Sequence, residues 1–421
     1  MERDPQPRSG ARVALLLLLG INLFNYIDRQ ILAAVEPEIR RTLFAPTDVN
    51  AMAKTGWMAT AFLVSYMISA PIFGRLADRF SRWWLIAVGI TVWSLASGAT
   101  GLAGSFIILL VTRIFVGIGE GAYGPAAPTI LADLYPLQIR GRVMSVFFMA
   151  IPVGSALGYA FGGWASSHFG WRTAFYLVVP PGLLLAALCF FMREPQRGES
   201  SALPARRSRR ADIATLFKTR SYVVNTIAGA AMTFAIGGLA FWTPAYIYEF
   251  RKQPDLGRIN LTFGAIVVVA GFMATLLGGW AGDKLRARHP GSYFLVSGTG
   301  MLIGFPFVLA MLFIPFPWAW VAIFFAVFFL FLNTGPSNTA LANVTPPAIR
   351  ATAFAVNIFM VHAFGDAISP PLIGAIAGHA NMNVAFFVVS ITMAVAGVLW
   401  LWGARFLPAD TAAVEATMLK E

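Results

Sequence analysis

Apolar stretches long enough to cross a bilayer follow one another along this chain of 421 residues. About 20 apolar residues span the hydrocarbon core, and they must form a helix because no water is present there to satisfy the backbone. Composition agrees, since 58% of the residues are hydrophobic and only 12% are charged. The sequence therefore predicts an all-α integral membrane protein with twelve transmembrane helices. The predicted spans are 12–35, 51–76, 83–104, 106–130, 141–167, 172–192, 221–248, 259–282, 292–314, 318–341, 351–378 and 382–405.

Lysines and arginines are distributed unevenly among the segments between these spans. The N-terminal segment, alternate loops, the central loop and the tail hold most of them. Loops rich in basic residues stay on the cytoplasmic side, so we expect a multi-pass protein of a cell membrane, the bacterial inner membrane, with both termini cytoplasmic. The net charge of +12 then follows from topology and from contact with membrane lipids, and it does not indicate a nucleic-acid partner.

The longest polar interruption divides the predicted spans into two sets of six. It covers residues 193–220 and is interpreted as a cytoplasmic linker. We expect an N-terminal six-helix bundle over residues 1–192, and a C-terminal six-helix bundle with a short cytoplasmic tail over residues 221–421.

Internal repetition supports this division. LADLYPLQIRG, from Leu131, aligns with LANVTPPAIRA, from Leu341. GRLADR, from Gly74, aligns with GWAGDK, from Gly279, at nearly the same offset. A duplicated six-helix unit is typical of a transporter whose halves alternate around a central site.

The segment GRLADRFSRWW, residues 74–84, resembles the signature loop between helices 2 and 3 of the major facilitator superfamily. The weaker copy GWAGDKLRAR falls where that family repeats the motif. More narrowly, NYIDR, RIFVGIGEGAYGPAAPTILADL and IRGRVMSVFFMAIPVGSALGY resemble the Spinster group of lipid transporters. The resemblance implies a monomer with two pseudo-symmetric bundles, in which helices 1, 4, 7 and 10 line the substrate cavity.

The same motif predicts a gate on the cytoplasmic side. A carboxylate followed by basic residues suits a latch that holds the two halves together while the outside is open. A topogenic basic loop is the plainer alternative, but it leaves the spacing from glycine to aspartate unexplained. The predicted gating residues are Gly74, Asp78, Arg79, Arg82, Arg140 and Asp283.

Charged residues deep inside the predicted spans are Asp28, Arg29, Arg113, Glu120 and Asp366. Each costs at least ~2.5 kcal/mol to place in the bilayer, so their positions are informative. Asp28 and Arg29 point about 100° apart on one helix and cannot face each other. Asp28 and Arg113 lie at similar depth and form the preferred pair, and Glu120 lies two turns from Arg113 on the same face.

We therefore predict Asp28, Arg113 and Glu120 as the proton-coupling residues. Protonation of Asp28 would cancel its charge, free Arg113 and change which conformation is favoured. The alternative is a static network that only fixes helix packing, although a buried ion pair is weak stabilisation compared with apolar packing.

On helix 5, Gly154, Gly158 and Gly162 recur every four residues and predict a close helix contact.

A polar wall on helices 1 and 4 and an aromatic wall on helices 7 and 10 suit an amphipathic substrate with a charged head and a long tail. Arg29 is expected to meet either Glu120 or an anionic head group, and the head group is favoured. Aromatic side chains in such helices also serve packing. The predicted substrate-binding residues are Asn25, Tyr26, Arg29, Glu120, Phe234, Trp242 and Asn333.

The remaining titratable residues predict no cofactor and no metal site. His362 and Asp366 are four residues apart, as in a structural pair or a proton relay, and the structural reading is favoured. Cys189 is the single cysteine, so no intramolecular disulfide can form. No Walker-type loop occurs, which leaves ATP-driven transport without support.

The predicted function is secondary active transport, coupled to protons, of an amphipathic lipid such as a lysophospholipid or a sphingosine-phosphate-like molecule, by alternating access. The partners would be this substrate, protons and membrane lipids. A proton-coupled transporter of a hydrophilic organic anion, such as a sugar acid, and a passive lipid facilitator stay open as alternatives. An enzyme is not predicted, because no nucleophile, base and metal ligands gather at a common depth.

Overall fold

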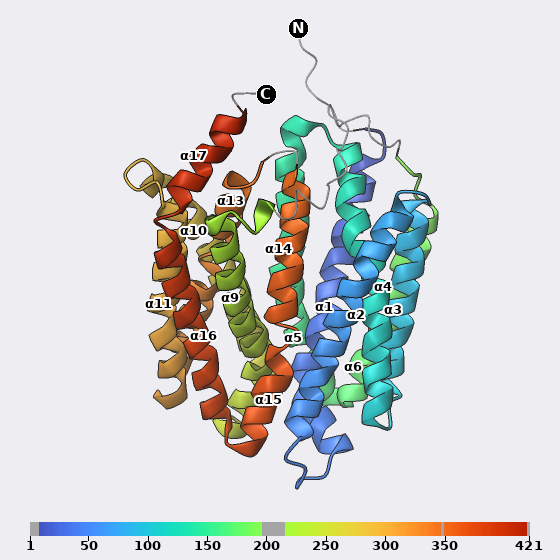
Figure 1. Ribbon diagram of the computed structural model, residues 1–421. Coiled ribbons are helices and arrows are strands. Elements are labelled where there is room, and N and C mark those ends of the chain that lie inside the picture. Colours follow the sequence, from blue (N-terminus) through green and yellow to red (C-terminus); the bar gives the residue numbers. More distant parts are fainter. Residues whose placement is uncertain (1–7, 196–214, 347–348, 419–421) are drawn as a thin grey trace. The chain divides into compact units, whose positions relative to one another are not determined.

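The computed structural model describes residues 8–195, 215–346 and 349–418, and all regular structure in these ranges is helical (Figure 1). Within them, twelve helical segments are long and apolar enough to cross a membrane, which confirms the predicted number. Most of the predicted linker, residues 193–220, lies outside the described ranges. The spans are Ala11–Leu43, Ala51–Ala77, Arg82–Gly101, Phe106–Leu134, Ile139–Phe169, Trp171–Phe190, Arg220–Phe250, Leu256–Arg286, Ser292–Phe313, Ala319–Asn343, Thr352–His379 and Met382–Gly403.

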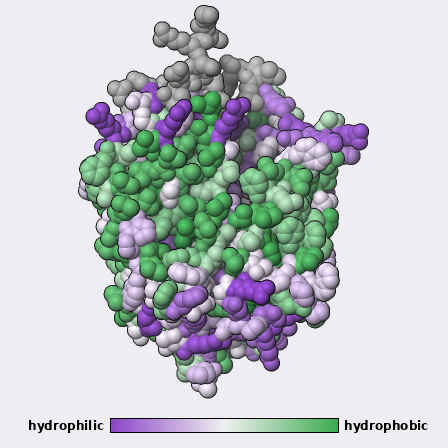
Figure 2. Space-filling view, turned by 180° about the vertical axis from the view of Figure 1, so that it is seen from behind, coloured by the Kyte–Doolittle hydropathy of each residue, from purple (hydrophilic) through white to green (hydrophobic). Residues whose placement is uncertain are grey.

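The surface of the described residues matches a protein that lies in lipid. Figure 2 shows hydrophobic side chains over the middle of the visible face and hydrophilic ones gathered towards its two ends. Large apolar side chains such as Leu16, Phe115 and Ile303 are exposed. Water would penalise so much exposed apolar surface, whereas hydrocarbon solvates it.

The chain divides into two compact units. Unit 1 comprises Met1–Pro204 and Pro244–Ala265, and unit 2 comprises Ala205–Thr243 and Ile266–Glu421. The segment Pro244–Ala265, which the predicted boundaries assign to the C-terminal bundle, is therefore grouped by its contacts with unit 1. The predicted boundaries, drawn at the polar linker and supported by the repeat, stay a prediction.

In unit 1, α4 is packed between α2 and α3, and α5 runs along α1. Ser81 and Ser105 begin α3 and α4, because each side-chain oxygen accepts a hydrogen bond from a free backbone N–H of the first turn. The helices are α1 (Ala11–Leu43), α2 (Ala51–Ala77), α3 (Arg82–Gly101), α4 (Phe106–Leu134), α5 (Leu137–Phe169), α6 (Trp171–Leu177), α7 (Val179–Phe190), the π-helix η1 (Tyr246–Phe250) and the first part of α10 (Leu256–Arg286).

The glycine stripe on α5 lies against α1, as its spacing predicts. A Cβ atom on Gly154 would lie 2.8 Å from the Cβ of Tyr26, and one on Gly162 would lie 2.9 Å from the Cβ of Ala34. Only glycine allows so close an approach of the two backbones. The contact fixes the rotation of α1, and with it the direction in which the polar residues of α1 point.

Unit 2 holds α9 (Arg220–Ala245) except its last two residues, the rest of α10, α11 (Ser292–Phe313), α12 (Ala319–Phe331), α13 (Thr334–Asn343), α14 (Arg350–Phe364), α15 (Ser369–His379), α16 (Met382–Gly403) and α17 (Leu407–Met418). Helix α17 was not predicted.

Three predicted spans are discontinuous helices. The span 172–192 is interrupted between α6 and α7, just before Pro180. The span 318–341 is interrupted between α12 and α13, just before Pro336, and the span 351–378 is interrupted between α14 and α15, just before Pro370. Proline has no N–H to donate and clashes with the preceding turn, so a break on its N-terminal side is expected. The first helix differs in the other direction, because it continues to Leu43 and does not end at residue 35.

We predict that Gly158→Ala lowers stability while Gly141→Ala, on the same helix, does not. A Cβ atom on Gly158 would lie 2.8 Å from the Cβ of Gln30 on α1, whereas one on Gly141 would meet nothing within 4 Å. Overpacking should cost about 1–3 kcal/mol at Gly158. At Gly141 the better helix propensity of alanine should be neutral or favourable. Thermal unfolding in detergent measures both, and equal stability of the two variants would contradict the close packing.

Candidate functional site

Glu120 lies at the centre of the charged interior of unit 1. Its glycine neighbours on α4 explain how it reaches α1. A Cβ atom on Gly119 would lie 2.6 Å from the carbonyl oxygen of Gly89 on α3, and one on Gly121 would collide with Ser69 on α2. The two glycines therefore let α3 and α2 close on either side of α4. Glu120, with 1% of its surface exposed, is left to meet side chains of α1.

Arg29 of α1 is the partner of Glu120. Arg29 Nε donates to Glu120 Oε2 at 2.7 Å, and Arg29 Nη2 lies 2.6 Å from the same oxygen. Three rings surround the guanidinium, with its Cζ 4.8 Å from the centroid of Tyr26, 4.8 Å from that of Phe62 and 5.3 Å from that of Tyr66. Of the two partners expected for Arg29, the structure shows Glu120, and the head-group contact stays a prediction.

The predicted direct pair between Asp28 and Arg113 is not formed. The hydroxyl of Ser97 on α3 donates to Asp28 Oδ1, while Arg113 Nη2 donates to Thr100 Oγ1, also on α3, at 2.7 Å. Both charged side chains are buried. The hydroxyls of Ser97 and Thr100 on α3 thus bind the two charged side chains that their similar depth in the membrane had predicted to pair with each other.

Asp28 and Arg113 each keep unused hydrogen-bonding capacity. Asp28 Oδ2 and Arg113 Nε have no hydrogen-bond partner among the described residues. The guanidinium of Arg113 also lies over the ring of Phe175, 5.5 Å from its centroid. A carboxylate and a guanidinium that are buried, close and incompletely satisfied form an arrangement in which a proton or a ligand changes the balance of charge.

Asn25 and Tyr26 lie beside these charged residues, and their predicted contact with substrate stays a prediction. Asn25 is 3% exposed, and its side chain lies against Glu120. The structure therefore brings together Asn25, Tyr26, Asp28 and Arg29 of α1 with Arg113 and Glu120 of α4. We call these six residues the unit-1 charge cluster.

The three predicted substrate residues of unit 2 are packed inside that unit. Trp242 Nε1 donates to the carbonyl of Pro370 at 2.9 Å, and the indole is fully buried. Asn333 Nδ2 donates to the carbonyl of Leu330 at 2.6 Å, within its own helix. Phe234 is 8% exposed. Their contact with substrate stays a prediction, and the interactions observed are those of a packed interior.

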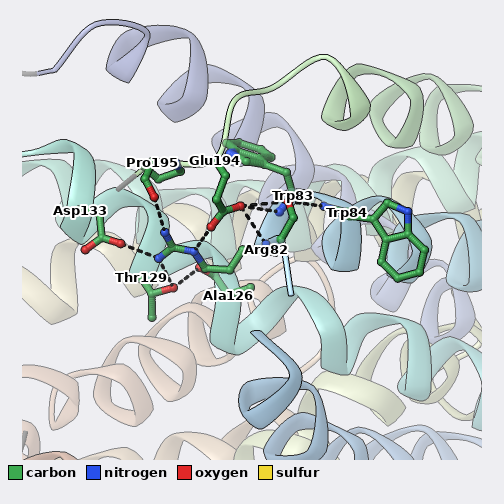
Figure 3. Close-up of polar contacts among 9 residues, drawn as sticks. Arg82, Trp83, Trp84, Ala126, Thr129, Asp133, Glu194 and Pro195 are labelled. Carbon is green, nitrogen blue, oxygen red and sulfur yellow. Dashed lines mark hydrogen bonds and ion pairs between the residues drawn. The ribbon is translucent and has the colours of Figure 1, made fainter. Parts of the chain in front are cut away.

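Arg82 is the best-connected of the predicted gating residues (Figure 3). It begins α3 with 4% of its surface exposed. Its Nε donates to Glu194 Oε1 at 2.6 Å, and its Nη1 donates to Asp133 Oδ2 at 2.6 Å and to Thr129 Oγ1 at 3.2 Å. The backbone N–H of Arg82 also donates to Glu194 Oε2 at 2.9 Å, so this carboxylate caps α3. The guanidinium of Arg82 thus links the start of α3 to the end of α4 and to the segment that follows α7.

Sequence reasoning missed both acidic partners of Arg82. Asp133 lies near the end of α4, and Glu194 follows the last span of the first six. A signal was available, because an isolated acid at the end of a span in a basic region needs a cation nearby.

The other predicted gating residues of unit 1 lie near helix ends. Asp78 is the C-cap of α2, Arg79 follows it in the turn before α3, and both of these residues are exposed. Arg140 Nη2 donates to the carbonyl of Tyr135 at 3.3 Å. A Cβ atom on Gly74 would lie 3.7 Å from Pro125, an ordinary contact, so packing does not require glycine there. The gating role of these residues stays a prediction.

In unit 2, Asp283 accepts a hydrogen bond from the hydroxyl of Tyr293 at 2.8 Å. His362 and Asp366 face each other as their spacing predicts, with Nδ1 and Oδ1 2.9 Å apart at the break between α14 and α15. Among the described residues, no group of three or more histidine, cysteine or carboxylate side chains could hold a metal ion.

A second charge network was missed because the first helix is longer than predicted. Glu36, fully buried, accepts from Thr55 Oγ1 at 2.7 Å and from Arg40 Nε at 2.9 Å. Arg40 also pairs with Glu249 of η1, to which Arg41 forms an ion pair at 3.1 Å. All five residues belong to unit 1. The spacing of Glu36 and Arg40, four residues apart, was the available signal.

The sequence model described as Major Facilitator Superfamily matches residues 18–367. With its twelve spans and buried intramembrane charges, the chain belongs to the major facilitator superfamily, whose members are transporters and not enzymes.

Within that superfamily the similar proteins are Spinster proteins, which confirms the narrower resemblance. Protein spinster homolog 1 of Homo sapiens is 36% identical over 404 residues, covering 89% of this chain and 75% of that protein. The sphingosine-1-phosphate transporter SPNS2 of Danio rerio is 36% identical over 393 residues, covering 87% and 76%. Protein spinster of Drosophila melanogaster is 34% identical over 379 residues, and the match covers 86% of this chain but only 61% of that protein.

Solved structures support the fold. A bacterial homolog of the human lysosomal transporter Spinster, in an inward-facing and unoccupied conformation, has a TM-score of 0.79 at 22% identity, covering 98% of this chain and 99% of that one. A D-xylose-proton symporter has a TM-score of 0.74 at 20% identity, covering 92% and 96%. At such identities the similarity establishes the fold alone.

We predict that Glu194→Gln destabilises the protein by about 1.5–3 kcal/mol, the usual range for a hydrogen bond to a charged group. The reason is that Arg82 is buried and would keep only one carboxylate partner. Glu415→Gln is the matched control, because Glu415 and Arg286 lie 3.8 Å apart and are both exposed. An exposed pair contributes about 0–1 kcal/mol. Chemical unfolding in detergent compares the two variants, and equal losses would show that Arg82 does not depend on Glu194.

Proposed function

We propose that this transporter moves an amphipathic lipid, a lysophospholipid or a sphingosine-phosphate-like molecule, and that protons drive the movement. The observation that carries the proposal is the unit-1 charge cluster, in which Asp28, Arg113 and Glu120 are buried and Arg29 is partly buried within two apolar spans. Such groups are costly in a membrane and mark ion or substrate pathways.

The proton step is assigned to Asp28. Its Oδ2 has no hydrogen-bond partner in the described structure, so a proton can be accepted there without breaking the bond from Ser97. Protonation removes the negative charge of Asp28 and leaves the Arg113 guanidinium with the hydroxyl of Thr100 and the ring of Phe175. A cation left without a counter-charge favours any conformation that supplies one, which couples the proton to a change of state.

The head group is assigned to Arg29. Its guanidinium cannot be titrated off, and the rings of Tyr26, Phe62 and Tyr66 hold it in place while it contacts Glu120. An incoming phosphate competes with Glu120 for the same donors. The relative named as a sphingosine-1-phosphate transporter favours this substrate class.

The proposed cycle is alternating access in a monomer with both termini in the cytoplasm. The uneven distribution of basic residues supports the orientation. The cytoplasmic gate is assigned to Arg82 with Asp133 and Glu194, beside Asp78 and Arg79.

We predict that Asp28→Asn abolishes proton-driven flux of a lysolipid in proteoliposomes, because the amide cannot take up a proton. Asp48→Asn is the control. Asp48 lies in the exposed segment between α1 and α2, where a hydrogen bond from Lys54 at 2.7 Å holds the pKa of its carboxyl below the usual range. It therefore stays ionised as the pH falls through the range used for transport, and the control should keep the flux.

The measurement is uptake of labelled lysolipid with and without an imposed pH gradient, with the folded state checked by size-exclusion chromatography. Flux in Asp28→Asn that still follows the gradient would contradict the assignment. A parallel panel with sugar acids tests the hydrophilic-anion alternative, and gradient-independent lysolipid flux in the unmodified protein would favour a passive facilitator.

A further inference from the structure

One end of unit 2 brings the start of α9 and the end of α16 together. The indole of Trp400 donates to Asn225 Oδ1 at 2.9 Å, and a Cβ atom on Gly403 would lie 2.6 Å from the side chain of Val224. Both apolar spans stop at this level, with Arg220 as the first residue of α9. This end therefore lies where a hydrocarbon core gives way to lipid head groups.

Two arginines share one aromatic ring at this level. The Cζ of Arg405 lies 4.7 Å from the centroid of Phe406 and 4.8 Å from that of Trp402, and the Cζ of Arg220 lies 5.3 Å from the centroid of Phe406. Because both Cζ atoms lie near the same ring, the distance between them cannot exceed the sum of their distances to the Phe406 centroid. One phosphodiester can contact both.

Neither guanidinium has a carboxylate partner among the residues that the structure describes. The neighbouring acid, Asp410, accepts a hydrogen bond from the backbone N–H of Ser221 at 2.8 Å and so caps α9. Arg220 and Arg405 are both exposed. Like charges held this close repel each other, and an anion placed between them converts the repulsion into two attractive contacts.

An exposed apolar stripe on α16 leads to the two arginines. Its members are 44–57% exposed and recur at intervals of four, three and four residues, so they share one face of the helix. A stripe of this kind gives an acyl chain a surface that ends at the two charges. The stripe consists of Ile391, Val395, Val398 and Trp402.

We propose that Arg220 and Arg405 form a binding site for the phosphodiester of an anionic membrane phospholipid, whose acyl chain lies along the α16 stripe. Guanidinium is the side chain best suited to phosphate, since it contacts two oxygens at once. Trp402 at the level of the head groups is the usual anchor of a membrane interface. The site shares no residue with the unit-1 charge cluster, so the bound lipid is a resident ligand and not the transported one.

The test is native mass spectrometry of the protein purified in detergent, titrated with phosphatidylglycerol or with phosphatidylcholine of the same acyl chains. The double variant Arg220→Gln, Arg405→Gln removes both charges. The control Lys252→Gln, Arg258→Gln removes two exposed charges near η1, in the segment before α10 and at its start. We expect the unmodified protein and the control to bind phosphatidylglycerol about tenfold more tightly than phosphatidylcholine, and the double variant to lose this preference.

A preference retained in the double variant, or lost equally in the control, would overturn the proposal. Phe406→Leu keeps both charges but removes the ring that holds them, and it should weaken the preference as well, which guards against a double variant that does not fold. Inorganic phosphate at millimolar concentration should not displace the lipid. Displacement would show that the site binds a free anion and not a phospholipid.

Discussion

The ion pair between Arg29 and Glu120 is the interaction on which the interior of unit 1 depends. The Glu120 side chain is fully buried and that of Arg29 is 21% exposed, so neither charge could remain in an apolar span without the other. The glycines beside Glu120 bring α2 and α3 onto α4, and the glycine stripe of α5 sets the rotation of α1. Close backbone packing thus positions the charges, and the charges in turn define the polar interior.

This arrangement gives two chemically different cations. Arg29 has a carboxylate and three aromatic rings, whereas Arg113 has one hydroxyl and the ring of Phe175, and it makes no hydrogen bond to the Asp28 carboxylate nearby. The first is suited to exchange its carboxylate for a ligand anion. The second is suited to respond when a nearby carboxylate gains a proton. A transporter that couples protons to an anionic head group needs both behaviours, and both occur within one six-helix unit.

The sequence predicted the number of helices, the charges inside the spans and a close helix contact along the glycine stripe of α5, because hydropathy and spacing are local signals. The structure shows that α1 makes this contact. The sequence did not predict which charges touch. Depth along two helices matched Asp28 to Arg113, but the hydroxyls of Ser97 and Thr100 on a third helix intervene, and nothing in the periodicity of α3 marks them. Glu194 was missed because it lies 112 residues after Arg82 in the sequence, and no local pattern connects the two residues.

Family membership and substrate depend on different kinds of observation. The length of the match and the twelve spans establish the superfamily, whereas the substrate depends on a few side chains whose contacts change during transport. Phe234, Trp242 and Asn333 show the difficulty, because they were predicted to contact substrate at the cavity wall of helices 7 and 10, while each is packed within unit 2. Evidence for the cargo therefore has to come from the charged residues of unit 1.

A double-mutant cycle on Arg29→Gln and Glu120→Gln tests the central claim, that these two charges depend on each other. Each single variant leaves an uncompensated buried charge and should lower the free energy of unfolding by about 3–5 kcal/mol. The double variant leaves none, so its loss should be clearly smaller than the two single losses combined. Losses that simply add would show that the two residues are stabilised independently, and the account of the unit-1 charge cluster would then be wrong.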